Sequence, residues 1–370
     1  MQTPFRYDYV GSFLRPESLK KARKDYEAKL ISKDELTQIE NECIKDLVSK
    51  QKELGYHVIT DGEFRRSTWH LDFMWGFEGI EHSKTQNGLP FHGEAAMIDD
   101  TYLVSKLRYK GTHPFIDHFK YLKQFEDESC VAKLTIPSPA QFLEQLIMPF
   151  ARTNTLKYYN SDEEVIADLV KCYNEFIKDI YKAGCKNLQF DDCSWGLLVD
   201  PSATRVFDTD FIGLDRIKRL FVDVNNSVIK NKPEGMVINT HICRGNFHST
   251  YASSGAYDAV SKYVLKDELV NAFYLEFDDE RSGSFEALKE VPEKTYVVLG
   301  LITTKSPKLE DKELVLKRIH EASKYHSLDY LCLSPQCGFA SCEIGNKLSE
   351  EEQFAKLKLV KEIALEVWSK

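Results

Sequence analysis

Short apolar runs alternate with longer amphipathic stretches along most of the chain. The short runs are rich in Val, Ile and aromatic residues, a composition that favours buried strands. The stretches between them repeat apolar residues at intervals of three and four, which is the spacing of one helix face. This pattern predicts eight strands, centred near residues 6, 57, 132, 187, 236, 273, 296 and 330, with helical sequence between them.

Two predicted helices begin with a capping box. In Ser32-Lys33-Asp34-Glu35 a hydroxyl at the N-cap is followed three residues later by a carboxylate, and Ser349 with Glu352 repeats the arrangement. Strand–helix alternation repeated eight times predicts an α/β fold, namely a (β/α)8 TIM barrel. A doubly wound sheet needs fewer strands and is the second choice.

The interval after the second strand is too long for an ordinary loop. It is an insertion at about residues 67–128, in which Asn87-Gly88 predicts a hairpin turn and residues 114–125 a helix. Excursions of this length are commonly functional lids or binding segments. We therefore expect residues 1–370 to form a single catalytic barrel domain. The inserted segment is expected to be a lid or an oligomer contact, so a homo-oligomer is one expectation.

Composition narrows the class of protein. The formal net charge of the 370 residues is -9 and 42% of them are hydrophobic, which predicts a sizeable core and no nucleic-acid partner. No apolar run reaches the length of a membrane span, and the first residues lack the apolar core of a signal peptide. We expect a cytoplasmic protein with no membrane partner, whose nine cysteines are mostly reduced and form no disulfide framework.

In a (β/α)8 barrel the active site forms at the C-terminal ends of the strands. Polar or metal-binding side chains follow seven of the eight predicted strands: Ser12, Glu63, Asp191, His241 with Cys243, Glu276, Lys305 and Cys337. Taken alone, each has an ordinary explanation, such as a helix cap, a solvated charge or a buried thiol. Their convergence on one end of a barrel is much less expected by chance and predicts a functional site.

His241 and Cys243 are two residues apart in an extended segment, so their side chains project from the same face. An isolated His-x-Cys is more often a core cysteine beside a hydrogen-bonded histidine. With Cys337 and a carboxylate oxygen of Glu276, however, the pair makes four ligands that suit Zn²⁺ better than Mg²⁺ or Ca²⁺. Because a carboxylate is the weakest of these ligands, the set predicts a catalytic zinc that can take a substrate sulfur as a thiolate. The remaining cysteines are expected to be small core residues: Cys43, Cys130, Cys172, Cys185, Cys193, Cys332 and Cys342.

The chain resembles the C-terminal catalytic barrel of the cobalamin-independent methionine synthase family, in a short single-barrel form. The resemblance runs from near residue 8 to the C-terminus and rests on these segments: Val10-Gly11-Ser12-Phe13, Gly62-Glu63-Phe64, Gln189-Phe190-Asp191-Asp192, His241-Ile242-Cys243, Leu275-Glu276, Lys305-Ser306-Pro307 and Pro335-Gln336-Cys337-Gly338. It implies a zinc-dependent (β/α)8 enzyme like 5-methyltetrahydropteroyltriglutamate–homocysteine S-methyltransferase. Such an enzyme moves a methyl group to the thiol of homocysteine and forms methionine.

The resemblance also implies a role for each site residue. The zinc ligands would be His241, Cys243, Glu276 and Cys337. Ser12 would hold the homocysteine carboxylate, and Glu63 and Asp191 would flank its ammonium. Lys305 stands where the family has a histidine thought to protonate the leaving folate nitrogen, which makes Lys305 the candidate proton donor. An ordinary lysine pKa of about 10.4 makes it a poorer acid than histidine unless burial lowers that pKa.

The methyl-donor side departs from the family. Ile136-Pro137-Ser138 stands where the family places a tryptophan against the pterin, and we expect no second barrel for the polyglutamate tail of the folate. The donor is therefore open among methyltetrahydrofolate, a methylated corrinoid protein and a methyl-sulfonium compound.

Other functions also remain open. One is a zinc-dependent alkyltransferase that acts on a different small thiol. Another is a structural zinc in a barrel that binds a ligand or partner through its insertion. A metal-free decarboxylase of the same barrel type is the last, but it leaves His241, Cys243 and Cys337 without a role.

Overall fold

Parallel strands close into a barrel in the computed structural model, which describes residues 1–369. The barrel strands are β1 (Val58–Ile59), β6 (Val131–Ala132), β7 (Leu134–Pro137), β8 (Asn187–Asp191), β9 (Val237–Ile242), β10 (Ala272–Glu276), β11 (Tyr296–Ile302) and β12 (Leu331–Pro335). β7 to β12 form one parallel sheet in chain order, and β1 pairs with β6, which continues into β7 beyond Lys133. The N-terminal segment completes the ring, because Tyr7 bridges Leu333 of β12 and Ser12 bridges Gly62 after β1. The predicted (β/α)8 barrel is confirmed.

The first predicted strand forms only these bridges and no continuous ladder. Its Asp8 carboxylate accepts hydrogen bonds from the backbone N–H groups of Tyr9 at 2.7 Å and Phe5 at 3.2 Å. Such local bonds compete with strand pairing. By contrast, β8, β9, β10 and β12 are buried at every residue. Parallel strands covered on both faces read as continuous apolar runs, which is why the sequence predicted them well.

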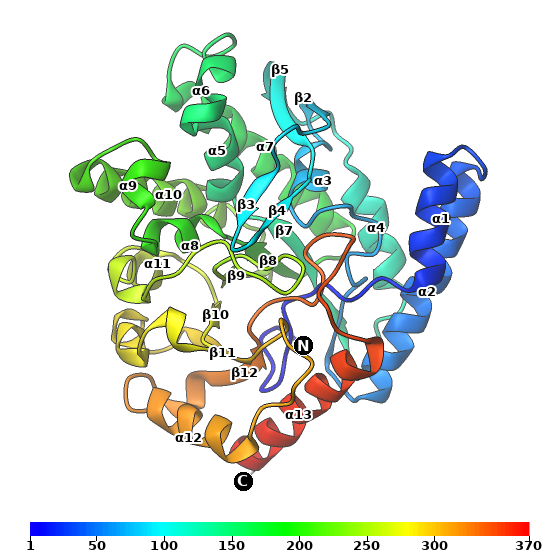
Figure 1. Ribbon diagram of the computed structural model, residues 1–370, viewed down its shortest axis with the longest axis vertical. Helices are drawn as coiled ribbons and strands as arrows, with labels where there is room; N and C mark the ends of the chain where they lie inside the picture. The colour runs from blue at the N-terminus through cyan, green and yellow to red at the C-terminus, as the bar shows by residue number, and fades with distance from the viewer. Residues whose placement is uncertain (370) are drawn as a thin grey trace.

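Helices surround the strands (Figure 1). They are α1 (Glu17–Glu27), α2 (Lys33–Glu53), α5 (Pro139–Ile147), α6 (Pro149–Thr155), α7 (Asp162–Lys182), α8 (Ser194–Val199), α9 (Ala203–Val206), α10 (Phe211–Ile229), α11 (Val264–Asp267), α12 (Lys312–Ala322) and α13 (Glu350–Trp368), with 3-10 turns η1 (Tyr257–Ala259), η2 (Glu280–Ser282), η3 (Phe285–Glu290) and η4 (Leu328–Tyr330). Both predicted capping boxes are present, at Ser32 and at Ser349. Within residues 1–369, no helix is both long enough and apolar enough to cross a membrane.

The insertion after β1 has a structure of its own. Its elements are α3 (Leu71–Met74), β2 (Glu78–Ser83), β3 (Leu89–Phe91), β4 (Glu94–Ala96), β5 (Asp100–Arg108) and α4 (Pro114–Lys123). β2 pairs with β5 and β3 with β4, both antiparallel. The hairpin turn predicted at Asn87-Gly88 is wrong in position. The tight turn lies at His92-Gly93, where Phe91 pairs with Glu94 and Gly93 has a φ of +78°. The helix predicted near residue 114 is confirmed as α4.

A buried ion pair crosses the barrel interior. The Nζ of Lys133 lies 2.9 Å from Oδ1 of Asp8, and both side chains are fully buried. Lys133 also donates to Oε1 of Gln189 at 3.2 Å and lies 4.7 Å from the ring centre of Tyr274. The Tyr274 hydroxyl donates to Asp8 at 2.9 Å. These four buried polar side chains therefore satisfy one another by hydrogen bonds and an ion pair.

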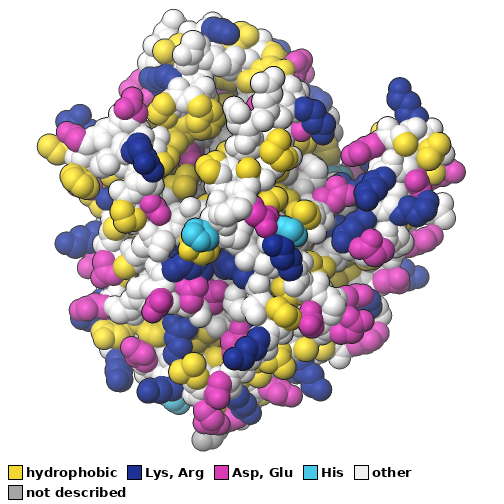
Figure 2. Space-filling view, viewed as in Figure 1, with side chains coloured by type: hydrophobic (Ala, Val, Ile, Leu, Met, Phe, Trp, Pro, Cys, Tyr) yellow, Lys and Arg dark blue, Asp and Glu magenta, His cyan; other side chains and the backbone are white. Residues whose placement is uncertain are grey.

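The outer surface mixes side chains of every kind. On the face shown in Figure 2, basic and acidic side chains are interspersed, with hydrophobic ones scattered among them. Most of the buried apolar residues belong to one continuous core that joins the barrel wall to its helices and reaches into the insertion.

Candidate metal centre and its surroundings

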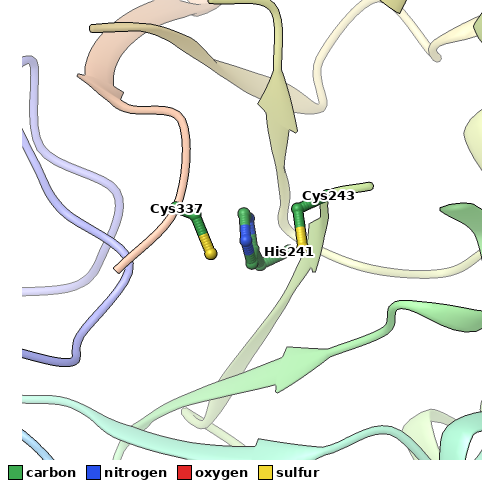
Figure 3. Close-up of side chains that lie close together, drawn as sticks. All are labelled: His241, Cys243 and Cys337. Atoms are coloured by element: carbon green, nitrogen blue, oxygen red, sulfur yellow. The ribbon is translucent and has the colours of Figure 1, made fainter. Parts of the chain in front are cut away.

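The side chains of His241, Cys243 and Cys337 converge at the C-terminal ends of the barrel strands, the barrel mouth (Figure 3). His241 lies on β9, Cys243 follows that strand directly, and Cys337 lies on the loop after β12. All three are buried, and one donor atom from each lies within 4.8 Å of the other two. In residues 1–369, no other set of three or more His, Cys, Asp or Glu side chains meets this distance.

The orientation of the His241 ring is set by the neighbouring strand. Its Nδ1 lies 3.1 Å from the carbonyl oxygen of Tyr274, which pairs with His241 in the sheet register. A carbonyl only accepts, so Nδ1 carries the proton and Nε2 keeps a free lone pair. That Nε2 is buried and has no hydrogen-bond partner among the described residues. An unpaired imidazole nitrogen beside two thiols fits a zinc ion, and the backbone contact resembles the outer hydrogen bond of metal-bound histidines.

The thiol of Cys243 has an acidic character. Hydrogen bonds from the thiols of Cys193 and Cys337 lower the pKa of Cys243 well below its ordinary value. Burial acts in the opposite direction but is outweighed. The geometry therefore favours a thiolate at Cys243, which is the form that binds metals.

Glu276 is close to these three residues but is not part of their group. It ends β10 and is fully buried. Its Oε2 accepts a hydrogen bond from the backbone N–H of Arg244 at 2.8 Å, and its Oε1 accepts one from Nη2 of Arg281 at 3.2 Å. The Nζ of Lys305 lies 3.5 Å from the same Oε1. The carboxylate is thus held by positive and donor groups, and its role as a metal ligand stays a prediction.

Lys305 lies in an acidic environment. Its Nζ lies 3.5 Å from Oδ2 of Asp278 as well as from Glu276. Burial alone would lower the pKa of Lys305, but these two carboxylates outweigh it and raise the pKa above its ordinary value. A lysine needs a lowered pKa to act as an acid at neutral pH, and the surroundings of Lys305 do not provide it.

Two carboxylates predicted to bind an ammonium lie beside the group of three. Asp191 pairs with His241 in the sheet register, so both side chains point to the barrel interior. Burial raises the pKa of Asp191 to about 7, the Glu63 carboxylate adds to the rise, and His241 opposes it. Glu63 has a φ of +61°, an uncommon conformation for a residue with a side chain. One of its oxygens, Oε2, is buried without a hydrogen-bond partner among residues 1–369.

Ser12 is packed against the loop that carries Cys337. Its hydroxyl oxygen accepts a hydrogen bond from the backbone N–H of Ala340 at 3.3 Å, and its carbonyl accepts one from Phe339 at 3.0 Å. A Cβ at Gly338 would come within 1.9 Å of the Ser12 hydroxyl, so only glycine permits this approach. Ser12 and Cys337 are therefore held on adjoining segments of the barrel mouth.

Cys193 lies closer to the candidate metal centre than the sequence predicted. The Sγ of Cys193 lies 3.3 Å from the Sγ of Cys243, although the pattern predicted a simple core cysteine. Cys193 follows the Asp191-Asp192 end of β8, so its place after a barrel strand was the signal that could have identified it.

Comparisons with known proteins agree with this arrangement. Residues 6–86 and 153–366 match the family described as cobalamin-independent synthase, catalytic domain. The Bacillus subtilis protein YxjH, which is named as uncharacterized, is 41% identical over 99% of this chain and 96% of its own length. A methionine synthase of Saccharolobus solfataricus is 24% identical over 89% of this chain and 86% of its own length.

Solved structures show the same architecture. A putative vitamin-B12 independent methionine synthase from Listeria monocytogenes superposes with a TM-score of 0.78 at 33% identity, covering 100% of both chains. A B12-independent methionine synthase from Shewanella sp. W3-18-1, in complex with selenomethionine, gives a TM-score of 0.71 at 18% identity over 98% of both chains. The second similarity is evidence for the fold alone.

Proposed function

Because the chain belongs to the family of cobalamin-independent methionine synthase catalytic domains, we propose that it transfers a methyl group to the thiol of homocysteine and forms methionine. The observation that carries this proposal is the group of His241, Cys243 and Cys337, in which two thiols lie beside a buried imidazole with one free nitrogen. A thiol-activating metal centre is the chemistry that such donors support best.

His241, Cys243 and Cys337 would hold a zinc ion, and Glu276 is the proposed fourth ligand. When bound, zinc lowers the pKa of a coordinated thiol, so the substrate sulfur meets the methyl donor as a thiolate. The surroundings of Glu276 support a ligand that can leave. When the Glu276 carboxylate leaves the metal, it can stay with Arg281, Lys305 and the backbone N–H of Arg244. Its departure therefore leaves no unpaired buried charge.

The amino-acid part of the substrate has a proposed site next to these ligands. Arg66 pairs with Oε1 of Glu63 at 3.2 Å, but Oε2 of Glu63 is buried without a hydrogen-bond partner among the described residues. Burial and the Glu63 carboxylate raise the pKa of Asp191 despite the opposing effect of His241 and Arg66. An ammonium between the two carboxylates would bind the free Oε2 and keep Asp191 ionised. The Ser12 hydroxyl, on the segment beside Cys337, is the proposed contact for the substrate carboxylate.

The β3–β4 hairpin of the insertion is proposed as a lid of the single barrel domain. The backbone N–H of His92 donates to Tyr251 O at 2.8 Å, so the hairpin contacts the loop that follows Cys243. Glu94 accepts a hydrogen bond from His248 at 2.8 Å on that loop and pairs with Lys347 at 2.9 Å, on the loop after Cys337. One hairpin carboxylate thus joins the two loops that carry the candidate ligands, which supports a role in closing the site.

The methyl donor is the open part of the proposal. Lys305 remains the candidate proton donor to a leaving group, although its raised pKa would make that transfer slow. The experiment is a screen of zinc-loaded protein with homocysteine and, separately, methyltetrahydrofolate, a methylated corrinoid and a methyl-sulfonium compound, with methionine followed by mass spectrometry. Methionine with at least one donor is the expected result. The same screen is repeated with a different small thiol in place of homocysteine. If only that thiol is methylated, the protein is an alkyltransferase for that thiol.

A further inference from the structure

Three side chains form a continuous series of contacts from the β3–β4 hairpin to the Glu276 carboxylate. The His92 ring, at the turn of the hairpin, is nearly parallel to the Tyr251 ring, with an angle of 6° between the planes and 5.0 Å between the ring centroids. The guanidinium carbon of Arg281 lies 4.1 Å from the centroid of the same Tyr251 ring. Nη2 of Arg281 then donates a hydrogen bond to Oε1 of Glu276 at 3.2 Å. The series therefore connects the insertion to the proposed fourth metal ligand.

Backbone bonds hold the hairpin end of this series. The backbone N–H of His92 donates to the carbonyl of Tyr251 at 2.8 Å, and the Thr250 hydroxyl donates to the carbonyl of His92 at 2.8 Å. Beside them, the rings of Phe91 and Phe247 pack with their centroids 5.2 Å apart. The position of the Tyr251 ring is therefore tied to the hairpin.

The Arg281 guanidinium is held from its edge and from its face. Its Nε donates to Oδ2 of Asp279 at 2.8 Å, and its Nη2 lies 2.7 Å from the same oxygen. The Tyr251 ring covers one face of the guanidinium. Because a guanidinium is planar and rigid, contacts at its edge and on its face together set its orientation. That orientation directs Nη2 to Glu276.

Arg281 holds Glu276 more directly than the other cation at this carboxylate. The Nζ of Lys305 lies 3.5 Å from Oε1 of Glu276 and forms no hydrogen bond with the described residues. The guanidinium of Arg281 does form one. A charge-assisted hydrogen bond stabilises the carboxylate in the place that it would occupy after leaving a metal. The orientation of Arg281 therefore affects how readily Glu276 can leave.

We propose that Arg281 is a positioning residue that receives the Glu276 carboxylate when the substrate thiolate takes its place, and that the hairpin keeps Arg281 in position through His92 and Tyr251. This inference rests on the proposed metal centre and keeps its four ligands. A closed hairpin then favours exchange of the carboxylate for the thiolate, so that closure of the site and binding of the substrate sulfur support each other. Without the Tyr251 ring the guanidinium can turn away, and Glu276 competes better with the thiolate.

Calorimetric titration of the zinc-loaded protein with homocysteine and with methionine tests this role without reference to activity. Tyr251→Leu is expected to weaken the binding of homocysteine about fivefold, since it removes the cation–π contact with Arg281. His92→Ala should weaken it about threefold, since the outer ring of the series is lost. Methionine brings no thiolate to the metal, so its affinity should change little in either variant.

Two further variants serve as controls. Tyr251→Phe keeps the ring and is expected to retain the homocysteine affinity that Tyr251→Leu loses. Tyr325→Leu is the matched control, because the Tyr325 ring also faces a cation, with Nζ of Lys289 5.2 Å from its centroid. Lys289 belongs to η3 and Tyr325 follows α12, so neither is part of the series. The homocysteine affinity of Tyr325→Leu should equal that of the unchanged protein.

The outcomes separate this inference from the function on which it rests. Unchanged homocysteine affinity in Tyr251→Leu, or an equal loss for homocysteine and methionine, would overturn the positioning role and leave the proposed centre intact. Unchanged homocysteine affinity in His92→Ala would overturn the part of the hairpin. His92 is exposed, so His92→Ala still decides if Tyr251→Leu does not fold.

The proposed function has its own readout. X-ray absorption at the zinc edge of the unchanged protein is expected to gain about one sulfur neighbour when homocysteine is added. A protein that binds no zinc, or whose zinc gains no sulfur, would overturn the proposed function and this inference together.

Discussion

The His241 imidazole donates through Nδ1 to the carbonyl of Tyr274, 3.1 Å away on the next strand. Because the two residues pair in the β9–β10 register, the barrel itself holds the ring by Nδ1 and leaves the buried Nε2 without a partner among residues 1–369. The hydroxyl of the same Tyr274 donates to Asp8 deeper in the barrel. The candidate metal centre therefore rests on the polar interior of the barrel, and a change in that interior should affect both stability and metal binding.

Replacing Cys337 should remove the metal. Cys337→Ser lacks one of the sulfurs of the three-residue group, so we expect the zinc content to fall from about one per chain to well below one. The measurement is metal analysis after dialysis, with Cys43→Ser as the control. Full zinc content in Cys337→Ser, with an unchanged fold by circular dichroism, would show that Cys337 is not a ligand.

Binding of the product should weaken in acid. Burial raises the pKa of Asp191 to about 7 in the substrate-free protein, so its carboxyl is neutral below that pH and charged above it. Only the charged form pairs with an ammonium. We expect the affinity for methionine, which has no thiol to titrate, to fall up to tenfold from about pH 8 to about pH 6.

Calorimetric titration with methionine checks this expectation. Asp191→Asn should bind more weakly and lose the pH dependence. Glu144→Gln is the control. Burial also raises the pKa of this carboxyl, to about 8, but Glu144 lies on the helix α5 and not in the proposed ammonium site. An Asp191→Asn variant with the original pH dependence would remove Asp191 from the proposed ammonium site.

Removing Lys133 should destabilise the barrel. Lys133→Met leaves the buried Asp8 carboxylate without its cation, which costs about 3–5 kcal/mol of unfolding free energy. Denaturant unfolding measures this loss, and the double variant with Asp8→Asn should recover part of it. If Lys133→Met is as stable as the unchanged protein, the ion pair does not stabilise the barrel.

Loosening the hairpin should expose the site. Glu94→Gln removes the charge that pairs with His248 and Lys347, so backbone amides of residues 89–96 should exchange with deuterium several-fold faster. Glu78→Gln is the matched control, since its partner Arg108 lies in the same insertion but away from both ligand loops. Equal exchange in Glu94→Gln and the unchanged protein would show that Glu94 does not hold the hairpin closed.

The barrel could be predicted from sequence because its strands are covered on both faces. Runs such as Tyr296–Ile302 stay apolar throughout, and helices with clear caps separate them. The first strand was harder, since Asp8 satisfies backbone groups locally instead of leaving them for a ladder. The hairpin turn was misplaced because both Gly88 and Gly93 adopt a positive φ, and only strand pairing shows that the chain reverses at Gly93.

The side chains at the strand ends were predictable, but their contacts were not. The two-residue spacing of His241 and Cys243 follows from strand geometry alone. The approach of Cys193 depends on β8–β9 pairing and on the close packing allowed by Gly196, neither of which the local sequence reveals. The hold of Lys305 on Glu276 likewise joins two barrel segments, because Lys305 follows β11 and Glu276 ends β10.

The central claim is that a metal held by His241, Cys243 and Cys337 makes a small thiol reactive toward a methyl donor. The most direct test measures methionine formation from homocysteine before zinc removal, after removal with a chelator, and during stepwise return of zinc. The account predicts that activity disappears with the metal and returns in proportion, up to about one zinc per chain. Methionine formation that continues undiminished in the zinc-free protein would contradict it.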